Sequence, residues 1–118
     1  MDVDQLIKIM RVAAEAGLRS PEQKAVFLEI ARAGETNILE LSGCDNTLEP
    51  EAKRIRGAIG PLTKEGMPRS GGSRQAGLGL VNSRPGRFIT EGSTRPLNGY
   101  TLTPKGRRYL IKMDLAQK

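Results

Sequence analysis

Apolar residues recur at helical spacing near the start of the chain, between signals that mark the ends of a first helix. The pattern predicts a helix from about Asp4 to Ala16, closed by Gly17, which can adopt the left-handed conformation of a helix end. We expect one apolar face on this helix, formed by Leu6, Met10, Ala13 and Ala14.

Two further helices carry a proline just after a capping residue. Ser20 can cap a second helix, Pro21 fits its first position, and Gln23 can reach back to the Ser20 amide. Gly34 ends that helix, whose apolar face is formed by Val26, Phe27, Ile30 and Ala31. Thr103-Pro104 repeats the signal and predicts a closing helix, with apolar contacts from Tyr109, Leu110, Met113 and Leu115.

The segment between these helices predicts a short helix, a turn and a longer basic helix. Residues 36–43 indicate an extended stretch and then a short helix, and residues 44–47 form a turn whose side chains bond to nearby backbone. From Pro50 onward, one apolar stripe follows helical spacing and consists of Ala52, Ile55, Ile59 and Leu62. Gly60 and Pro61 predict a kink or a break at that point.

Residues 66–99 have the composition of a loop or hairpin, because they hold eight of the 14 glycines. Two stretches can pair as strands: Leu78–Ser83, with an extension toward Thr90, and Tyr100–Thr103. The hairpin tip then falls at Glu91–Asn98, and the basic side chains near it are Arg84, Arg87 and Arg95.

Charge is unevenly distributed along the chain. The 118 residues carry 19 Lys plus Arg and 13 Asp plus Glu, for a net charge of +6. Residues 1–50 hold nine acidic and five basic residues, whereas residues 51–118 hold four acidic and 14 basic ones. A basic half favours a polyanionic partner, of which the phosphate backbone of nucleic acid is the commonest inside a cell. Charges that only keep the surface solvated are the alternative.

Composition argues against several classes of function. With no His and a single Cys, zinc sites, Ser–His or Cys–His catalysis and a disulfide framework are hard to build. The glutamates show no paired arrangement for acid–base chemistry, so we expect no enzyme activity, metal or cofactor. Cys44 is expected to be a small residue of the turn rather than an oxidant sensor.

The sequence gives no sign of a membrane segment. No apolar run approaches the roughly 20 residues that span a bilayer, and the first residues lack the pattern of a signal peptide. We therefore expect a cytoplasmic, nucleoid-associated protein with no membrane partner.

The order of these elements is that of a winged helix-turn-helix, and two stretches resemble MarR-type regulators. Glu40-Leu41-Ser42 and the stripe through Ile55, Ile59 and Leu62, followed by Lys64-Glu65-Gly66-Met67, are similar to their helix-turn-helix, whose recognition helix ends in a Leu-x-x-x-Gly-apolar step. Tyr100-Thr101-Leu102-Thr103-Pro104-Lys105-Gly106-Arg107 resembles their last wing strand turning into the following helix. The resemblance covers roughly residues 20–112. It implies an α+β, mostly α fold: a winged helix-turn-helix with a Gly-rich β-hairpin wing.

The chain departs from that family in two places. The stretch between Met67 and Tyr100 is longer and richer in glycine than the usual wing, and residues 79–84 are a second candidate for its start. The terminal helices are shorter than the usual dimerisation helices, so we expect no small-molecule effector. We interpret residues 1–118 as one domain, with N-terminal helices at 1–34, the helix-turn-helix at 36–66, the wing region at 67–103 and a C-terminal helix at 104–118.

The resemblance assigns DNA contacts to three groups of residues. A recognition helix fits the major groove, and its side chains that reach base edges or phosphates are Asn46, Thr47, Lys53, Arg54, Arg56 and Lys64. Wing arginines suit phosphates or a narrow minor groove, and they are Arg69, Arg74, Arg84, Arg87 and Arg95. Cations in the first turn of the closing helix oppose its dipole unless a phosphate lies nearby, and they are Lys105, Arg107 and Arg108.

These residues predict a sequence-specific regulator of transcription that binds double-stranded DNA as a homodimer, with its first and last helices at the interface. One alternative is a winged-helix module that positions DNA for a replication or recombination assembly. The other is a small inhibitor or interaction protein that binds an acidic protein surface. The three readings differ in what the chain binds: a palindromic site, DNA of any sequence, or no DNA.

Overall fold

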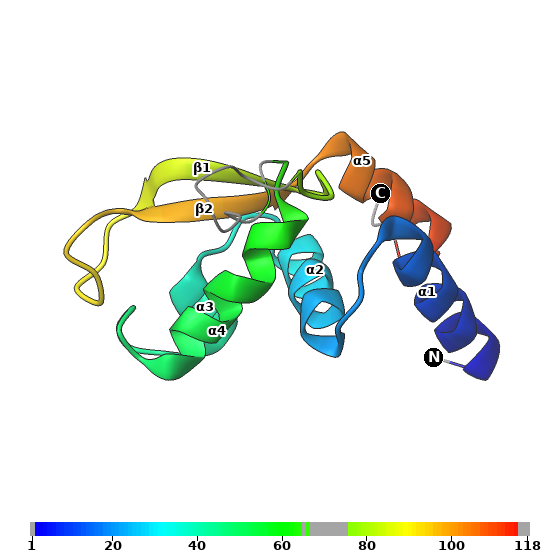
Figure 1. Ribbon diagram of the computed structural model, residues 1–118, viewed down its shortest axis with the longest axis horizontal. Coiled ribbons are helices and arrows are strands. Elements are labelled where there is room, and N and C mark those ends of the chain that lie inside the picture. The colour runs from blue at the N-terminus through cyan, green and yellow to red at the C-terminus, as the bar shows by residue number, and fades with distance from the viewer. Residues whose placement is uncertain (1, 65, 67–75, 116–118) are drawn as a thin grey trace.

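Helices form most of the structure, and one antiparallel hairpin completes an α+β fold (Figure 1). The computed structural model describes residues 2–64, 66 and 76–115. Within these residues the elements are α1 (Val3–Ala16), α2 (Pro21–Ala33), α3 (Ile38–Ser42), α4 (Pro50–Ile59), the 3₁₀ turn η1 (Gly60–Leu62), β1 (Val81–Phe88), β2 (Leu97–Leu102) and α5 (Pro104–Lys112). The predicted class, α+β and mostly α, is confirmed.

Side-chain caps begin the helices where the sequence predicts them. Ser20 Oγ accepts a hydrogen bond from the Gln23 amide at 3.0 Å, and Thr103 Oγ1 accepts one from the Gly106 amide at 3.0 Å. The predicted partner of the Gln23 side chain is wrong by one residue, because Oε1 accepts from the Arg19 amide at 2.9 Å instead of the Ser20 amide. Gly17 closes α1 in the left-handed region, with φ of 94°.

The prediction for the packed face of α1 is right only for Ala13, and it is wrong for Leu6, Met10 and Ala14, which are exposed. The buried residues of this helix are Ile9, Val12, Ala13 and Ala16. Leu6 and Met10 are instead 49% and 45% exposed. The helix carries two apolar stripes, and helical periodicity alone does not decide which one meets the core. The second stripe, left on the surface, consists of Val3, Leu6, Ile7 and Met10.

The predicted stripe of α4 packs into the core as expected. All four of its residues are buried: Ala52, Ile55, Ile59 and Leu62. The α-helix ends at Ile59 and continues as the single turn η1, so the predicted break at Gly60 is confirmed. Pro61 is the second residue of this turn, and the α-helix cannot continue through it because proline has no amide hydrogen for the next helical hydrogen bond. The four buried residues of this stripe belong to the same hydrophobic core as Phe27 and Ile30 of α2.

The hairpin pairs β1 with β2 in the register Val81↔Leu102, Ser83↔Tyr100 and Arg84↔Gly99. A bulge after Arg84 shifts the register, and pairing resumes at Phe88↔Leu97. Thr36 pairs with Tyr100 on the free side of β2, through hydrogen bonds of 3.2 and 2.8 Å. The predicted hairpin therefore exists, although its first strand begins at Val81 rather than at Leu78. Its second strand begins at Leu97 rather than at Tyr100, so Leu97 and Asn98 belong to β2 and not to the tip.

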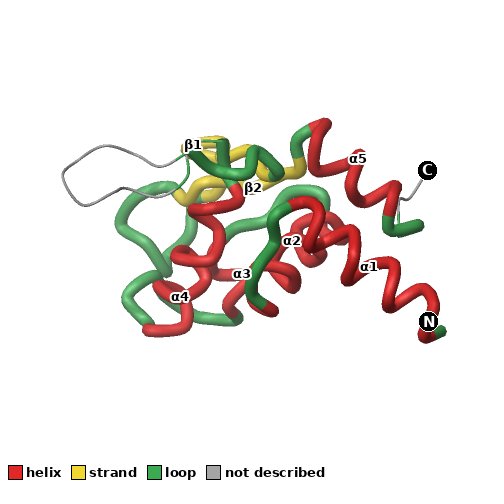
Figure 2. Tube along the Cα trace, turned by 45° about the vertical axis from the view of Figure 1, so that its right-hand side comes forward, coloured by secondary structure: helices red, strands yellow, loops and turns green. Residues whose placement is uncertain are grey.

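The two ends of the molecule are built from different elements. Figures 1 and 2 show α1 and α5 side by side at one end, whereas the hairpin tip lies at the other end in Figure 1. At the first end, two ion pairs connect α1 to the C-terminal helix and the residues after it: Lys8 with Asp114, and Glu15 with Lys112. In the part of the chain that the structure describes, each helix is too short or too polar to cross a bilayer.

Candidate nucleic-acid interface

A groove of about 830 Å³ lies between α4 and the outer half of the hairpin. Its cations are Lys53 and Arg56 from α4 and Arg95 from the hairpin tip. Its hydroxyl and amide side chains are Thr47, Ser93, Thr94 and Asn98. We call this feature the α4–hairpin groove.

The groove exists because the hairpin tip is docked onto the turn before α4. The Thr47 amide donates a hydrogen bond of 3.1 Å to the Gly92 carbonyl. Only glycine fits at position 92, since a Cβ there would collide with the Asp45 carbonyl oxygen. The turn itself is held by Glu49, whose Oε2 accepts from the amides of Asp45 and Asn46 at 2.7 and 3.1 Å. The tip and α4 therefore face each other at a fixed separation.

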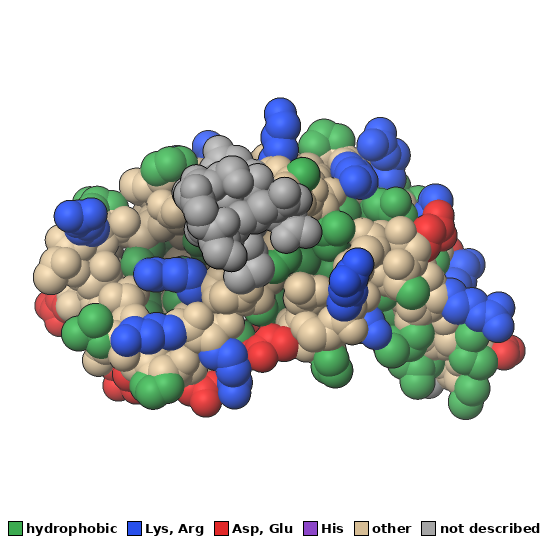
Figure 3. All heavy atoms as spheres, viewed as in Figure 1, with side chains coloured by type: hydrophobic (Ala, Val, Ile, Leu, Met, Phe, Trp, Pro, Cys, Tyr) green, Lys and Arg blue, Asp and Glu red, His purple; other side chains and the backbone are tan. Residues whose placement is uncertain are grey.

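The charged side chains in the described lining of the groove are all cationic. No Asp or Glu belongs to its lining among the described residues, and no described carboxylate lies within 4.0 Å of the cationic groups of Lys53, Arg56 or Arg95. Figure 3 shows Lys and Arg side chains over α4 and over the hairpin on the viewed face. Charges of one sign on both walls concentrate the field between them, which favours an anionic ligand.

Tyr100 forms part of the groove lining and is itself buried. Burial raises the pKa of its hydroxyl above the ordinary value of 10.0, whereas Asn98 and the charge of Arg56 act in the opposite direction. The hydroxyl is therefore protonated at neutral pH and contributes no negative charge to the groove.

Arg54 lies apart from this groove, although it belongs to the same helix. Its Nε is 3.0 Å from Glu22 Oε1, and its Nη2 also pairs with Glu51. The first pair ties α4 to α2. Asn46 is likewise engaged by its own turn, because its Oδ1 accepts from the Leu48 amide at 3.0 Å. Of the residues predicted around the recognition helix, the structure thus brings Thr47, Lys53 and Arg56 together in the groove.

Two hairpin arginines meet a carboxylate instead of the groove. Arg87 donates from Nε and Nη2 to the two oxygens of Glu35, both at 3.1 Å, and Arg84 Nη1 lies 3.7 Å from Glu35 Oε2. The hydrogen bonds from Arg87 hold the pKa of Glu35 below its ordinary value, with the charges of Arg87 and Arg84 adding to the effect against desolvation. The same contacts raise the pKa of Arg87.

The remaining predicted cations are dispersed over other parts of the structure. Lys105 Nζ donates to the Leu78 carbonyl at 2.8 Å, and Arg107 Nη1 donates to the Leu102 carbonyl at 3.1 Å. Arg108 and Lys64 are exposed. Arg69 and Arg74 lie outside the described residues.

Sequence reasoning missed the polar residues of the tip, Ser93 and Thr94, together with Asn98 and Tyr100. For Asn98 and Tyr100 the signal was the strand pattern, which predicted the hairpin but not the direction in which its tip folds. For Ser93 and Thr94 the chain offers no signal beyond their place in a loop.

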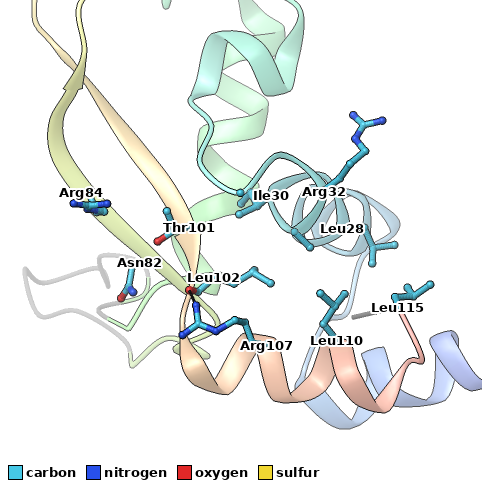
Figure 4. Close-up of a pocket in the computed structure, with 12 residues that line it drawn as sticks. Leu28, Ile30, Arg32, Asn82, Arg84, Thr101, Leu102, Arg107, Leu110 and Leu115 are labelled. Carbon is cyan, nitrogen blue, oxygen red and sulfur yellow. Dashed lines mark hydrogen bonds between the residues drawn. The ribbon is translucent and has the colours of Figure 1, made fainter. Parts of the chain in front are cut away.

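A second hollow, of about 770 Å³, lies between α2, α5 and the base of the hairpin (Figure 4). Apolar residues line one side of it: Leu28, Ile30, Leu110 and Leu115. Figure 4 shows Arg107 reaching the Leu102 carbonyl at its edge, while Arg84 and Asn82 come from β1. This hollow is built from other elements than the α4–hairpin groove, and three arginines line it together with the apolar residues: Arg32, Arg84 and Arg107.

Comparison with known proteins gives no match: no protein-family model, no curated protein and no solved structure matches the chain. The functional argument therefore rests on the geometry and charge of the described residues. Of the two hollows, the α4–hairpin groove contains more of the residues that the sequence predicts to contact DNA.

Proposed function

We propose that this chain is a winged-helix protein that binds double-stranded DNA and regulates transcription in a sequence-specific way, as a homodimer. The observation that carries the proposal is the α4–hairpin groove, with cations on both walls and no acidic residue in its described lining. The element order supports it, since α3, a turn and α4 are followed by a hairpin, as in a winged helix-turn-helix.

In this proposal a strand of the phosphate backbone occupies the groove. Lys53 approaches it from α4 and Arg95 from the wing, so neutralisation of phosphates releases condensed counterions. Hydroxyl and amide groups of Thr47 and Asn98 add hydrogen bonds that set the register on the backbone. The α4 helix then enters the adjacent major groove, where Arg56 can read guanine.

The ion pairs of Arg54 change the roles that we propose for the basic residues of α4. Reading a base with Arg54 requires breaking its contacts with Glu22 and Glu51, whereas no described carboxylate pairs with Arg56. We therefore assign base reading to Arg56, a phosphate contact to Lys53, and an anchoring role between α4 and α2 to Arg54.

The proposed dimer uses the exposed apolar stripe of α1. Its positions are symmetric about the point between Leu6 and Ile7, so an antiparallel pair of helices places Val3 of one copy opposite Met10 of the other. Asp4 and Arg11 are seven residues apart and so lie on one side of α1, where antiparallel pairing brings opposite charges of the two copies together. A self-complementary surface of this kind fits a two-fold dimer.

The first test is selection of bound molecules from a pool of random duplex DNA at several salt concentrations. We expect an enriched two-fold symmetric motif and an affinity that falls steeply with salt. Arg56→Gln should weaken the selected site by about 1–3 kcal/mol and relax its base preference. Arg19→Gln is the matched control, because Arg19 is exposed between α1 and α2 and its loss changes the net charge equally.

Equal losses for both variants on selected and random DNA would contradict the assignment of Arg56. Salt-sensitive binding without a motif would favour the module of a replication or recombination assembly. A protein partner is the remaining candidate, and one observation favours it: Leu48 and Ile89 are 78% and 91% exposed near the hairpin tip. Absence of DNA binding at moderate salt would select that reading.

A further inference from the structure

A second charged cluster lies outside the groove, where Glu35 meets β1. Nε and Nη2 of Arg87 donate to the two carboxylate oxygens of Glu35, both at 3.1 Å. Nη1 of Arg84 lies 3.7 Å from Glu35 Oε2. Paired parallel contacts of this type are the strong form of the arginine–carboxylate interaction. One carboxylate therefore accounts for two of the hairpin arginines.

The backbone around Glu35 is arranged to hold the carboxylate in this place. Its neighbour Thr36 is anchored to Tyr100 of β2 by two backbone hydrogen bonds. The strand residue beside the ion pair is Gly99, where a Cβ would collide with Glu35 Oε2 and lie 3.0 Å from Arg87 Cβ. The absence of a side chain at position 99 thus leaves room for Glu35 and Arg87 to form their ion pair beside β2.

The cluster is anchored but open to solvent. The side chains of Arg84 and Arg87 are 51% and 44% exposed, whereas that of Glu35 is 24% exposed. Both arginine side chains are therefore accessible to an anion from solvent. Phosphate and carboxylate present the same paired oxygens to an arginine, so the two anions compete for it.

We infer that Glu35 is an internal counter-ion that competes with the phosphate backbone of nucleic acid for Arg84 and Arg87. This inference rests on the proposed function, and it concerns the affinity of the hairpin for DNA of any sequence. A cation that is already neutralised releases fewer counterions from DNA. Glu35 therefore lowers non-specific affinity and increases the share of binding that depends on base contacts from α4.

The test compares Glu35→Gln with the wild type on a random-sequence duplex over a range of salt. The variant should bind several-fold more tightly, and its salt slope should steepen by about 0.9 for each cation set free. Glu15→Gln is the matched control, since it also removes one negative charge from an ion pair, that between Glu15 of α1 and Lys112 of α5. An equal gain for the control would overturn the inference, because net charge alone would explain it.

A double substitution separates competition from a positioning role. In an Arg84→Gln, Arg87→Gln background, Glu35→Gln should leave the affinity unchanged, because no arginine remains to be released. A gain that persists in this background overturns the inference. Weaker binding of Glu35→Gln alone, with its fold intact by circular dichroism, overturns it too and makes Glu35 a positioning residue for the hairpin.

The same variants on inorganic polyphosphate distinguish this inference from the proposed function. If duplex DNA binds no variant, the proposed function fails. Tighter polyphosphate binding by Glu35→Gln than by Glu15→Gln would still support competition at Arg84 and Arg87. Equal polyphosphate binding by the two variants would overturn it.

Discussion

Residues of the same type have different surroundings in this molecule, and those surroundings separate their roles. Arg54 and Arg56 are two positions apart on α4, yet the first pairs with Glu22 and the second lines the groove. The pairing carboxylates come from distant parts of the chain: Glu22 is 32 residues from Arg54, and Glu35 is 52 residues from Arg87. Such long-range partners leave no local pattern in the sequence.

The Glu35 ion pair predicts a pH dependence of stability. Hydrogen bonds from Arg87 hold the pKa of Glu35 below its ordinary value of 4.5. A carboxyl group with a lowered folded pKa stabilises the fold fully above its unfolded pKa, and this stabilisation disappears as the pH falls through the folded pKa. The wild type should therefore exceed Glu35→Gln in free energy of unfolding at neutral pH, and the difference should shrink below about pH 4.5.

Urea unfolding of both proteins between about pH 7 and pH 3 measures this difference. The slopes of the two transitions should agree, so that the comparison concerns stability and not the size of the unfolded chain. A difference that stays constant over this range would contradict the prediction, because a non-titrating contact would then account for it.

Among the elements, α5 depends most clearly on a single side chain. Thr103 Oγ1 accepts from the Gly106 amide at 3.0 Å and donates to the Gly79 carbonyl at 2.6 Å, so one hydroxyl caps α5 and joins it to the loop that leads into β1. Thr103→Ala should lower the free energy of unfolding by about 1–2 kcal/mol, through loss of the cap and of the second hydrogen bond.

Thr103→Ser is the matched variant, since it keeps the hydroxyl and removes only a methyl group. It should retain most of the stability in a urea titration. Comparable losses for the two variants would show that the methyl group, and not the cap, supports α5.

Elements with local signals could be predicted from the sequence, and those that depend on distant contacts could not. Ser20, Gly34 and Thr103 define helix ends through their own neighbours, and Gly60 ends α4 for the same reason. The packed face of α1 was predicted wrongly except at Ala13, because two apolar stripes compete within one helix.

The candidate site shows the same division. The cations of α4 were predicted because they lie off its apolar stripe. The groove itself depends on the contact between Thr47 and Gly92, which are far apart in the sequence. No periodicity or turn signal predicts where a hairpin tip docks, so the grouping of Arg95 with Lys53 and Arg56 required the structure.

At the scale of the whole molecule, the acidic half of the chain neutralises part of the basic half. Glu15 pairs with Lys112, Glu22 with Arg54 and Glu35 with Arg87. These pairs lie outside the α4–hairpin groove, whose cations have no carboxylate partner among the residues that the structure describes. The uneven charge of the sequence thus becomes a local positive surface and not a general one, which supports a defined contact with a polyanion.

The placement of the two ends in Figure 1 bears on assembly, because α1 and the groove lie far apart along the molecule. A dimer formed through α1 therefore leaves both grooves accessible, and two copies related by a two-fold axis present them to two half-sites. The proposed interface consists of side chains with little role in the monomer core, since Val3 is 70% exposed and Ile7 44%.

Leu6→Asp tests this interface. We expect the wild type to sediment at twice the 12.8 kDa mass of one chain and the variant to sediment as a monomer, because the two-fold axis places two new carboxylates, one from each copy, in an apolar contact. The fold should survive, as Leu6 is half exposed in the monomer. Leu48→Asp makes the same substitution at an exposed residue near the hairpin tip and should remain dimeric. Monomeric wild type at micromolar concentration, or equal dissociation of both variants, would exclude α1 as the interface.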